Sequence, residues 1–172
     1  MKKYSICMGM LILVLTFWLL LPGQFAGAQT ATDWPFYGKD LANTRFQDVD
    51  QINPGNVGGL KVAWVFHTGV LDPKAELEVS PIEVNGELFI TDGHDDVFAL
   101  DAATGQQKWS YKPIEIPGEM PPLDQISVCC GRNNRGVVFV PSTGSGGGSV
   151  IYGRLDDVVV ALDAKTGAVL WK

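Results

Sequence analysis

Short apolar runs separated by glycine, proline, asparagine and aspartate fill the chain beyond its first thirty residues. Brief runs of Val, Ile, Phe, Leu and Tyr between such residues are typical of short strands joined by tight turns. This part of the sequence has no convincing amphipathic helix. The pattern therefore predicts an all-β fold, with strands at Leu60–Thr68, Glu87–Thr91, Val97–Leu100, Gly136–Val140, Val150–Tyr152 and Val158–Leu162.

An eleven-residue repeat organises this pattern. Ala99–Trp109 and Ala161–Trp171 are identical at seven of eleven positions, and Trp64 stands in a similar context. The interval of 45 residues from Trp64 to Trp109 suits one four-stranded blade of a propeller, whereas the next interval is 62 residues. We expect each tryptophan to pack between neighbouring units and its indole N–H to find an acceptor there.

The first 28 residues have the three parts of a secretory signal. Lys2 and Lys3 precede an apolar run from Ile6 to Leu21, and the small residues Ala26-Gly27-Ala28 follow it. We expect residues 1–28 to be removed on export to the periplasm; an uncleaved membrane anchor is the alternative. Loss of the two lysines would change the formal net charge from −6 to −8. An acidic exported chain lacks the basic surface that nucleic-acid binding requires.

Two adjacent cysteines, Cys129 and Cys130, remain beyond the predicted signal. Paired cysteines in an oxidising compartment tend to form disulfides. A bond between sequence neighbours closes a strained ring, which is easier to reduce than an ordinary structural disulfide. The compartment favours this disulfide, and two free thiols in a loop are the alternative.

Three motifs resemble one enzyme family. The repeat Ala-x-Asp-x-x-Thr-Gly-x-x-x-Trp resembles the tryptophan-docking motif of the eight-bladed quinoprotein alcohol dehydrogenases, which use pyrroloquinoline quinone (PQQ). The opening Asp33-Trp34-Pro35-Phe36-Tyr37-Gly38 and the segments after it are similar to the family's first segment. Cys129-Cys130-Gly131-Arg132-Asn133-Asn134-Arg135-Gly136 is similar to its cofactor loop. The resemblance covers residues 33–172, and it implies that 29–172 form an incomplete domain, the first blades of a β-propeller.

The resemblance also implies roles for four residues. Cys129 and Cys130, joined as a disulfide, would lie flat against one face of the quinone. Arg135 would lie near the reactive quinone carbonyl and stabilise negative charge that develops on its oxygen. Glu78 would line the cofactor pocket. Without the cysteine motif, an exposed strand position for Glu78 and an ordinary surface charge for Arg135 are the simpler interpretations.

The family's metal, calcium or a lanthanide, and its catalytic aspartate are expected beyond Lys172, so we expect no metal ligand and no catalytic base in this chain. His67 and His94 lack a cluster of partners and are interpreted as structural or exposed.

The resemblance implies oxidation of a small alcohol, with electrons passing to PQQ and then to cytochrome c or a membrane quinone. As this fragment, the chain is expected to be inactive. The alternative is a non-enzymatic propeller scaffold for protein binding in the cell envelope. The cysteine pair favours the enzyme, because a scaffold has no need of a disulfide that faces a flat ligand.

Overall fold

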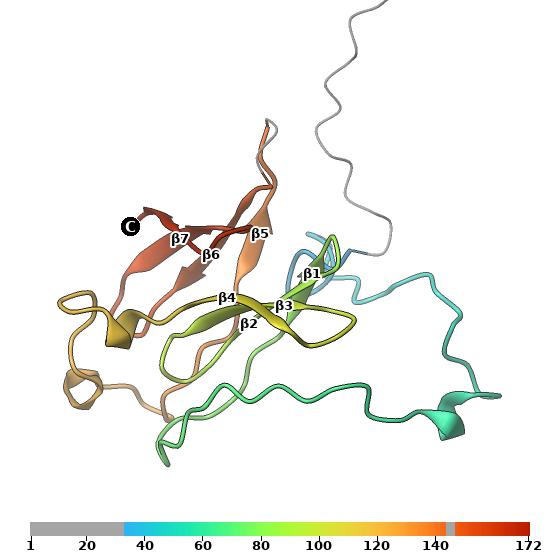
Figure 1. The fold of residues 1–172 in the computed structure, drawn as a ribbon, viewed down its shortest axis with the longest axis horizontal. Helices are drawn as coiled ribbons and strands as arrows, with labels where there is room; N and C mark the ends of the chain where they lie inside the picture. Colours follow the sequence, from blue (N-terminus) through green and yellow to red (C-terminus); the bar gives the residue numbers. More distant parts are fainter. Residues whose placement is uncertain (1–32, 144–146) are drawn as a thin grey trace, which may run out of the picture.

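The computed structural model describes residues 33–143 and 147–172; the predicted signal at 1–28 lies outside them. The described residues form two four-stranded antiparallel sheets with strand orders β1-β2-β3-β4 and β5-β6-β7-β8 (Figure 1). The first sheet consists of β1 (Ile82–Val84), β2 (Glu87–Thr91), β3 (Val97–Asp101) and β4 (Gln107–Tyr111). The second consists of β5 (Val138–Val140), β6 (Ser149–Gly153), β7 (Val159–Asp163) and β8 (Val169–Trp171).

Three short 3-10 helices complete the described secondary structure. They are η2 (Val57–Gly59), η3 (Pro113–Glu115) and η4 (Leu123–Gln125). Within 33–143 and 147–172, no helix has the length and apolar character needed to cross a bilayer. The described part of the chain is thus all-β, as the hydrophobic pattern predicts.

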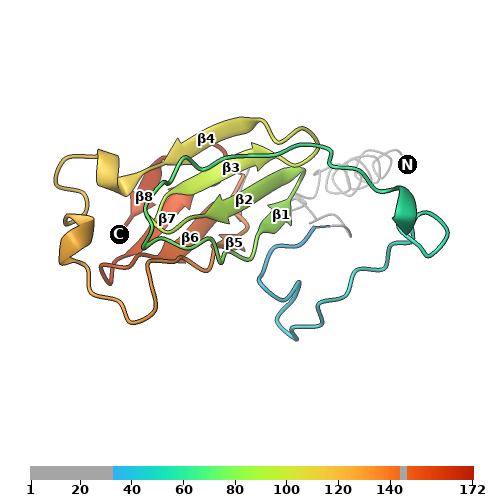
Figure 2. The same cartoon turned by 90° about the horizontal axis from the view of Figure 1, so that it is seen from below.

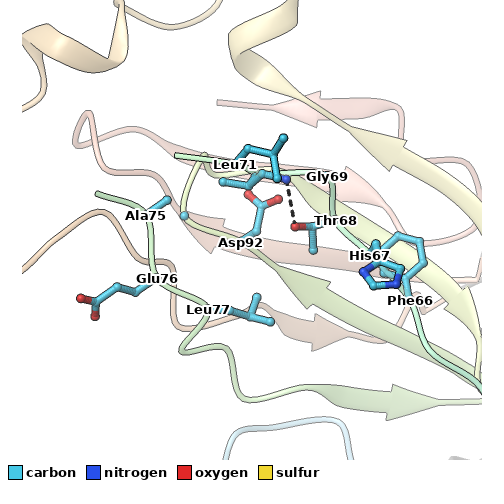
Figure 3. A pocket seen from close by; sticks show the side chains of 11 residues that line it. Phe66, His67, Thr68, Gly69, Leu71, Ala75, Glu76, Leu77 and Asp92 are labelled. Atoms are coloured by element: carbon cyan, nitrogen blue, oxygen red, sulfur yellow. Dashed lines mark hydrogen bonds between the residues drawn. The ribbon is translucent and has the colours of Figure 1, made fainter. Parts of the chain in front are cut away.

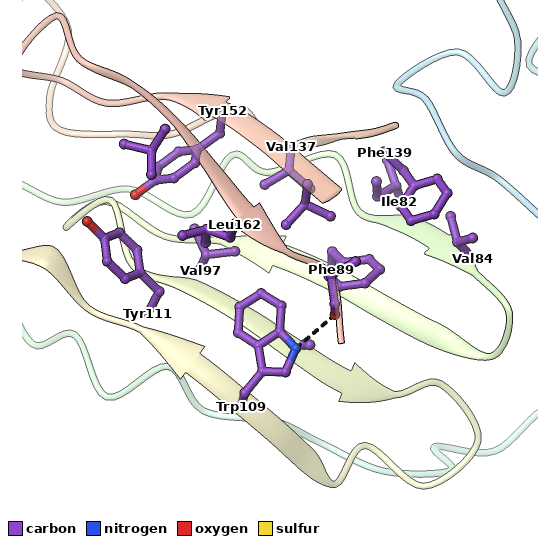
Figure 4. Packing of buried hydrophobic residues seen from close by; sticks show 14 residues of the cluster. Ile82, Val84, Phe89, Val97, Trp109, Tyr111, Val137, Phe139, Tyr152 and Leu162 are labelled. Carbon is purple, nitrogen blue, oxygen red and sulfur yellow. Dashed lines mark hydrogen bonds between the residues drawn. The ribbon is translucent and has the colours of Figure 1, made fainter. Parts of the chain in front are cut away.

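The main core lies between the two sheets (Figure 4). Residues of β1 to β7 point into it, because alternate side chains of a strand project to opposite faces. Phe89 of β2 faces this core, whereas its neighbour Ile90 joins a second cluster on the other face of the first sheet. The first sheet is therefore buried on both faces, and its central strands are apolar almost throughout.

Each docked tryptophan reaches forward to the turn of the next repeat. Trp109 is buried between the sheets and donates its indole N–H to the Ala164 carbonyl at 2.9 Å. A Cβ on Gly167 would lie 2.6 Å from the Trp109 ring, so the contact needs glycine there. Trp64 makes the equivalent contacts, with an N–H bond to the Ala102 carbonyl at 3.2 Å and its ring against Gly105. The predicted packing and the predicted acceptors are confirmed for Trp64 and Trp109, whereas Trp171 is 49% exposed.

The docking turn has the same hydrogen bonds in both copies. Asp101 Oδ1 accepts the backbone N–H of Ala103 and of Thr104, and the Thr104 hydroxyl at 2.8 Å. Asp163 repeats this pattern with Lys165 and Thr166. Short polar side chains that bond their own backbone stabilise such turns. The repeated sequence therefore specifies a repeated local structure.

The turn between the second and third strands of each sheet also repeats. In the β2–β3 turn Asp95 N–H bonds the Asp92 carbonyl at 3.2 Å, and in the β6–β7 turn Asp157 N–H bonds the Arg154 carbonyl at 3.2 Å. Asp95 has φ 62° and Asp157 φ 64°, so they occupy the same left-handed position. Asp95 is the first residue of its Asp-Asp pair, whereas Asp157 is the second residue of the pair Asp156-Asp157, so the two pairs are offset by one residue.

The predicted strand at Leu60–Thr68 is wrong. This segment is extended but forms no ladder, and it crosses the first sheet on the face opposite the second sheet (Figure 2). Trp64 and Phe66 pack on Ile90, Phe98 and Leu100, so its side chains alternate as in a strand. A strand also needs a hydrogen-bonded neighbour at its edge, and the described residues provide none there.

Candidate cofactor site

The four predicted site residues lie in two segments that run beside each other at the end of the first sheet. Glu78 precedes β1, and the two cysteines and Arg135 belong to the long connection between β4 and β5. The Arg135 guanidinium pairs with Glu78, with Nη2 to Oε2 at 3.0 Å. The backbone N–H of Ser80 bonds the Arg135 carbonyl at 3.2 Å. The structure therefore brings together two residues that are 57 positions apart in the sequence.

The Glu78–Arg135 pair is open to solvent. The Arg135 side chain is 74% exposed and that of Glu78 is 38% exposed. Gly136 allows the close approach of the two segments, since a Cβ on it would lie 2.8 Å from the Ser80 carbonyl oxygen. Its φ of 114° also favours glycine. The backbone thus presents the ion pair outward, where a bound molecule could reach it.

Cys129 and Cys130 are both exposed, and their sulfur atoms lie 2.8 Å apart. They are two thiols in this structure, so the disulfide stays a prediction. The hydrogen bond between them, and the charges of Cys129, Glu76 and Glu78, raise the pKa of Cys130. Both glutamates belong to the segment before β1 that runs beside the cysteine loop.

Arg132 anchors the cysteine loop from within. It is buried, and it forms an ion pair with Asp72, which also contacts His94 Nε2 at 3.3 Å. Its backbone N–H bonds the Lys74 carbonyl at 2.8 Å, and its carbonyl accepts the Glu76 N–H at 2.8 Å. His94 therefore has the structural role that its sequence context indicates.

Two hollows flank Glu76. One, of about 490 Å³, adjoins Cys130 and is bordered by Lys74, Glu76 and Arg132. The other, of about 320 Å³, is lined by residues 66–71, 75–77, Asp92 and Gly93 (Figure 3). Figure 3 shows the Glu76 side chain pointing away from Asp92. The first hollow lies beside the predicted cofactor residues, whereas the second lies against the segment that carries Trp64.

Asn134 is a site residue that the sequence interpretation missed. It lies between the cysteines and Arg135, and it is 5% exposed. Its side-chain amide donates to Asp95 Oδ1 at 2.7 Å and to the Gly153 carbonyl at 2.9 Å. Its backbone carbonyl accepts the Thr91 hydroxyl at 3.2 Å. The one signal in the sequence was its place beside Arg135, because a polar residue next to a functional one often fixes its backbone.

No group of three or more His, Cys, Asp or Glu side chains within 33–143 and 147–172 is arranged to hold a metal ion. The candidate site of the described residues is therefore a surface of thiols and one ion pair. The Arg135 guanidinium is 74% exposed and gives this surface a cationic group that an anionic molecule could contact.

Known proteins resemble this chain in sequence and fold. Residues 34–172 match the family described as "Glucose/ethanol/alcohol dehydrogenase, beta-propeller domain", with PQQ as its short name. The dehydrogenase subunit of the quinone-type alcohol dehydrogenase of Gluconobacter oxydans is 36% identical over 169 residues, covering 91% of this chain and 20% of that protein. The quinoprotein glucose dehydrogenase of Escherichia coli is 46% identical over 97 residues, covering 54% of this chain and 12% of that protein.

Solved structures give the same result. The quinohemoprotein alcohol dehydrogenase of Comamonas testosteroni has a TM-score of 0.61 and 31% identity, over 81% of this chain and 19% of that one. A europium-containing methanol dehydrogenase has a TM-score of 0.66 and 30% identity, over 82% of this chain and 23% of that one. The chain thus spans about one fifth of the length of these relatives. The two sheets are part of a β-propeller, and the chain belongs to the PQQ-type propeller family of glucose, ethanol and alcohol dehydrogenases.

Proposed function

We propose that this chain is the N-terminal part of a periplasmic, PQQ-dependent alcohol dehydrogenase. The observation that carries the proposal is the exposed Glu78–Arg135 pair, which joins the loop that carries the exposed Cys129 and Cys130 to the segment beside it. Family membership supports the cofactor, and the predicted signal at residues 1–28 supports export.

The residues present fit PQQ, a planar ring system with carboxylates and an ortho-quinone. Cys129 and Cys130, as a disulfide, provide a flat apolar surface for one face of the rings. Arg135 supplies a guanidinium for the anionic edge or for the quinone oxygen, and Glu78 orients that guanidinium at 3.0 Å. A cation held in place before the reaction stabilises developing negative charge without further reorganisation.

The chemistry that bound PQQ supplies is acceptance of a hydride from the alcohol. Cytochrome c or a membrane quinone would then take the electrons. Calcium or a lanthanide would bind to residues of the longer protein, as would the substrate alcohol and the catalytic base. On this proposal the 172-residue chain forms one wall of the site and is inactive by itself.

The test uses the complete gene product with added PQQ and either calcium or a lanthanide. We expect PQQ to bind, and we expect alcohols to reduce an artificial electron acceptor. Replacement of both cysteines by serine should weaken PQQ binding, whereas Asp157→Asn, at an exposed position in the β6–β7 turn, should not. A complete, folded protein that binds no PQQ would refute the proposal.

A further inference from the structure

We propose that Asp95, in the β2–β3 turn, is a positioning residue that fixes Arg135 through Asn134. This inference rests on the proposed function, because it assigns a role relative to the PQQ site. Asp95 does not reach the site itself; it acts on the backbone that carries the guanidinium.

Arg135 has little packing of its own to hold it. Its side chain is 74% exposed, and it is held by the ion pair with Glu78 and by the backbone bond to Ser80. The position of its Cα therefore depends on the residue before it. Asn134 is 5% exposed, and its side-chain oxygen accepts the Gly136 N–H at 3.1 Å. This hydrogen bond links the two residues that flank Arg135.

Asp95 is the central partner of Asn134. It is fully buried, and its Oδ1 accepts the Asn134 amide at 2.7 Å, while Oδ2 accepts the Leu155 N–H at 2.7 Å. The Asp95 carbonyl accepts the Tyr152 hydroxyl at 3.0 Å. One carboxylate thus joins the turn of the first sheet, the cofactor loop and the turn of the second sheet, and hydrogen bonds to a buried charged group are strong.

The same turn supports the loop at three further points. The Thr91 hydroxyl donates to the Asn134 carbonyl at 3.2 Å. Gly93 lies against the Arg132 carbonyl, where a Cβ would approach to 2.5 Å. His94 contacts Asp72, the partner of Arg132. Residues 91–95 therefore form a platform under both halves of the loop, the cysteine half and the arginine half.

The second sheet contains a matched comparison. Asp157 has the same turn position and nearly the same φ as Asp95, but it is exposed. Both positions favour Asp or Asn, which tolerate left-handed φ. The change of Asp to Asn therefore preserves the turn at either position. At position 95 the change also replaces one carboxylate oxygen with an N–H₂ group. The Asn134 amide and the Leu155 N–H both need an acceptor there, so at least one of their two hydrogen bonds is lost.

The experiment measures the absorption spectrum of bound PQQ, and kcat at saturating alcohol, in the complete holoenzyme. Arg135→Lys is the reference variant. We expect Asp95→Asn to change the spectrum in the same direction as Arg135→Lys and to lower kcat roughly 10- to 100-fold. Asp157→Asn should change kcat by no more than about twofold. The double variant Asp95→Asn with Arg135→Lys should have a kcat no lower than that of Arg135→Lys alone, because both changes disrupt the same interaction of the Arg135 guanidinium.

The outcomes separate the two proposals. A wild-type protein that binds no PQQ refutes the proposed function and this role with it. If the wild type binds PQQ but Asp95→Asn matches Asp157→Asn, or its effect adds fully to that of Arg135→Lys, only the positioning role is overturned. Should Asp95→Asn fail to fold, Asn134→Ser decides: it removes the amide that donates to Asp95, and a wild-type spectrum and kcat would overturn the role.

Discussion

Cys129 and Cys130 present two sulfur atoms 2.8 Å apart on an exposed loop. In an oxidising compartment paired cysteines tend to form a disulfide. We expect the exported protein, denatured without reductant, to take up no alkylating reagent at these positions, and to take up two equivalents after reduction. Mass spectrometry of the peptide that contains both residues measures this. Complete alkylation without reductant would favour the free-thiol alternative.

Asp96 should make the stability of the protein depend on pH. Its side chain is buried, with Oδ1 unpaired and Oδ2 3.9 Å from Lys112 Nζ. Burial, and then the charge of Asp92, raises the pKa of Asp96 to about 7 from an ordinary value of 3.8. A raised folded-state pKa means that the stabilising contribution is present below the unfolded pKa and is lost as the pH rises toward 7.

The measurement is the thermal unfolding midpoint of the complete protein at pH 5 and pH 8. Asp96→Asn mimics the protonated form, so we expect it to reduce the loss of stability between these two values. Asp157→Asn, at an exposed position in the equivalent turn, should leave the pH dependence as it is in the wild type. An unchanged pH dependence in Asp96→Asn would show that Asp96 does not titrate in this range.

Single residues differ in how far their sequence context predicts them. Asp101 and Gly105 were predictable, because a turn that begins with aspartate and ends with glycine is specified by local hydrogen bonds. The contact of Glu78 with Arg135 depends on how two distant segments pack, and only the family resemblance suggested that they share a site. Asn134 and Asp95 were missed because burial, not residue type, makes them important.

At the scale of elements, the contact of tryptophan with glycine joins the two sheets. Gly167 has φ 72° and touches the Trp109 ring, whereas Gly86 has φ 77° and a Cβ there would meet no atom within 4 Å. Both alanine variants strain the backbone, at a cost of about 1 kcal/mol. We expect Gly167→Ala to lower the free energy of unfolding of the complete protein by about 1 to 3 kcal/mol more than Gly86→Ala does, since the new methyl group displaces the Trp109 indole.

Chemical denaturation of the two variants measures this difference. Equal destabilisation by Gly86→Ala and Gly167→Ala would mean that the indole gives way without cost, and that the docking contact contributes little to the stability of the fold.

Strand positions follow from the sequence where the neighbouring strand is close in the chain. β2, β3, β6 and β7 were predicted to within about two residues, because hairpin partners and turn residues lie together. β1 was missed, although Asn85-Gly86 after it is a strong hairpin signal; both residues have positive φ, as a tight two-residue turn requires. The prediction of a strand at Leu60–Thr68 failed for the opposite reason. Its side chains alternate as in a strand, but its pairing partner would have to be a strand distant in the sequence.

At the scale of the whole molecule, the two sheets differ in what covers them. In the first sheet a row across the strands, formed by Ile82, Phe89, Ala99 and Trp109, packs on the second sheet. The equivalent row of the second sheet is Val138, Ile151, Ala161 and Trp171. Val138 is 42% exposed and Trp171 is 49% exposed, whereas Ala161 is buried, so the two edges of this row present apolar side chains to solvent.

An apolar sheet face without a cover promotes association. We expect the isolated 172-residue chain to be poorly soluble or to elute as large oligomers in size-exclusion chromatography. The complete protein, run under the same conditions, is the control. A monomeric, cooperatively unfolding fragment would contradict the expectation.

The forward reach of the tryptophans has a consequence for biosynthesis. Trp64 packs on the turn at Gly105, and Trp109 packs on the turn at Gly167, and both turns are synthesised after the tryptophan that they contact. Each repeat therefore makes its docking contact only when the next repeat has been synthesised. A chain that emerges from the ribosome in this order always has an unfinished newest sheet. The growing end of such a chain therefore stays loosely folded until the turn that receives its last tryptophan has been synthesised.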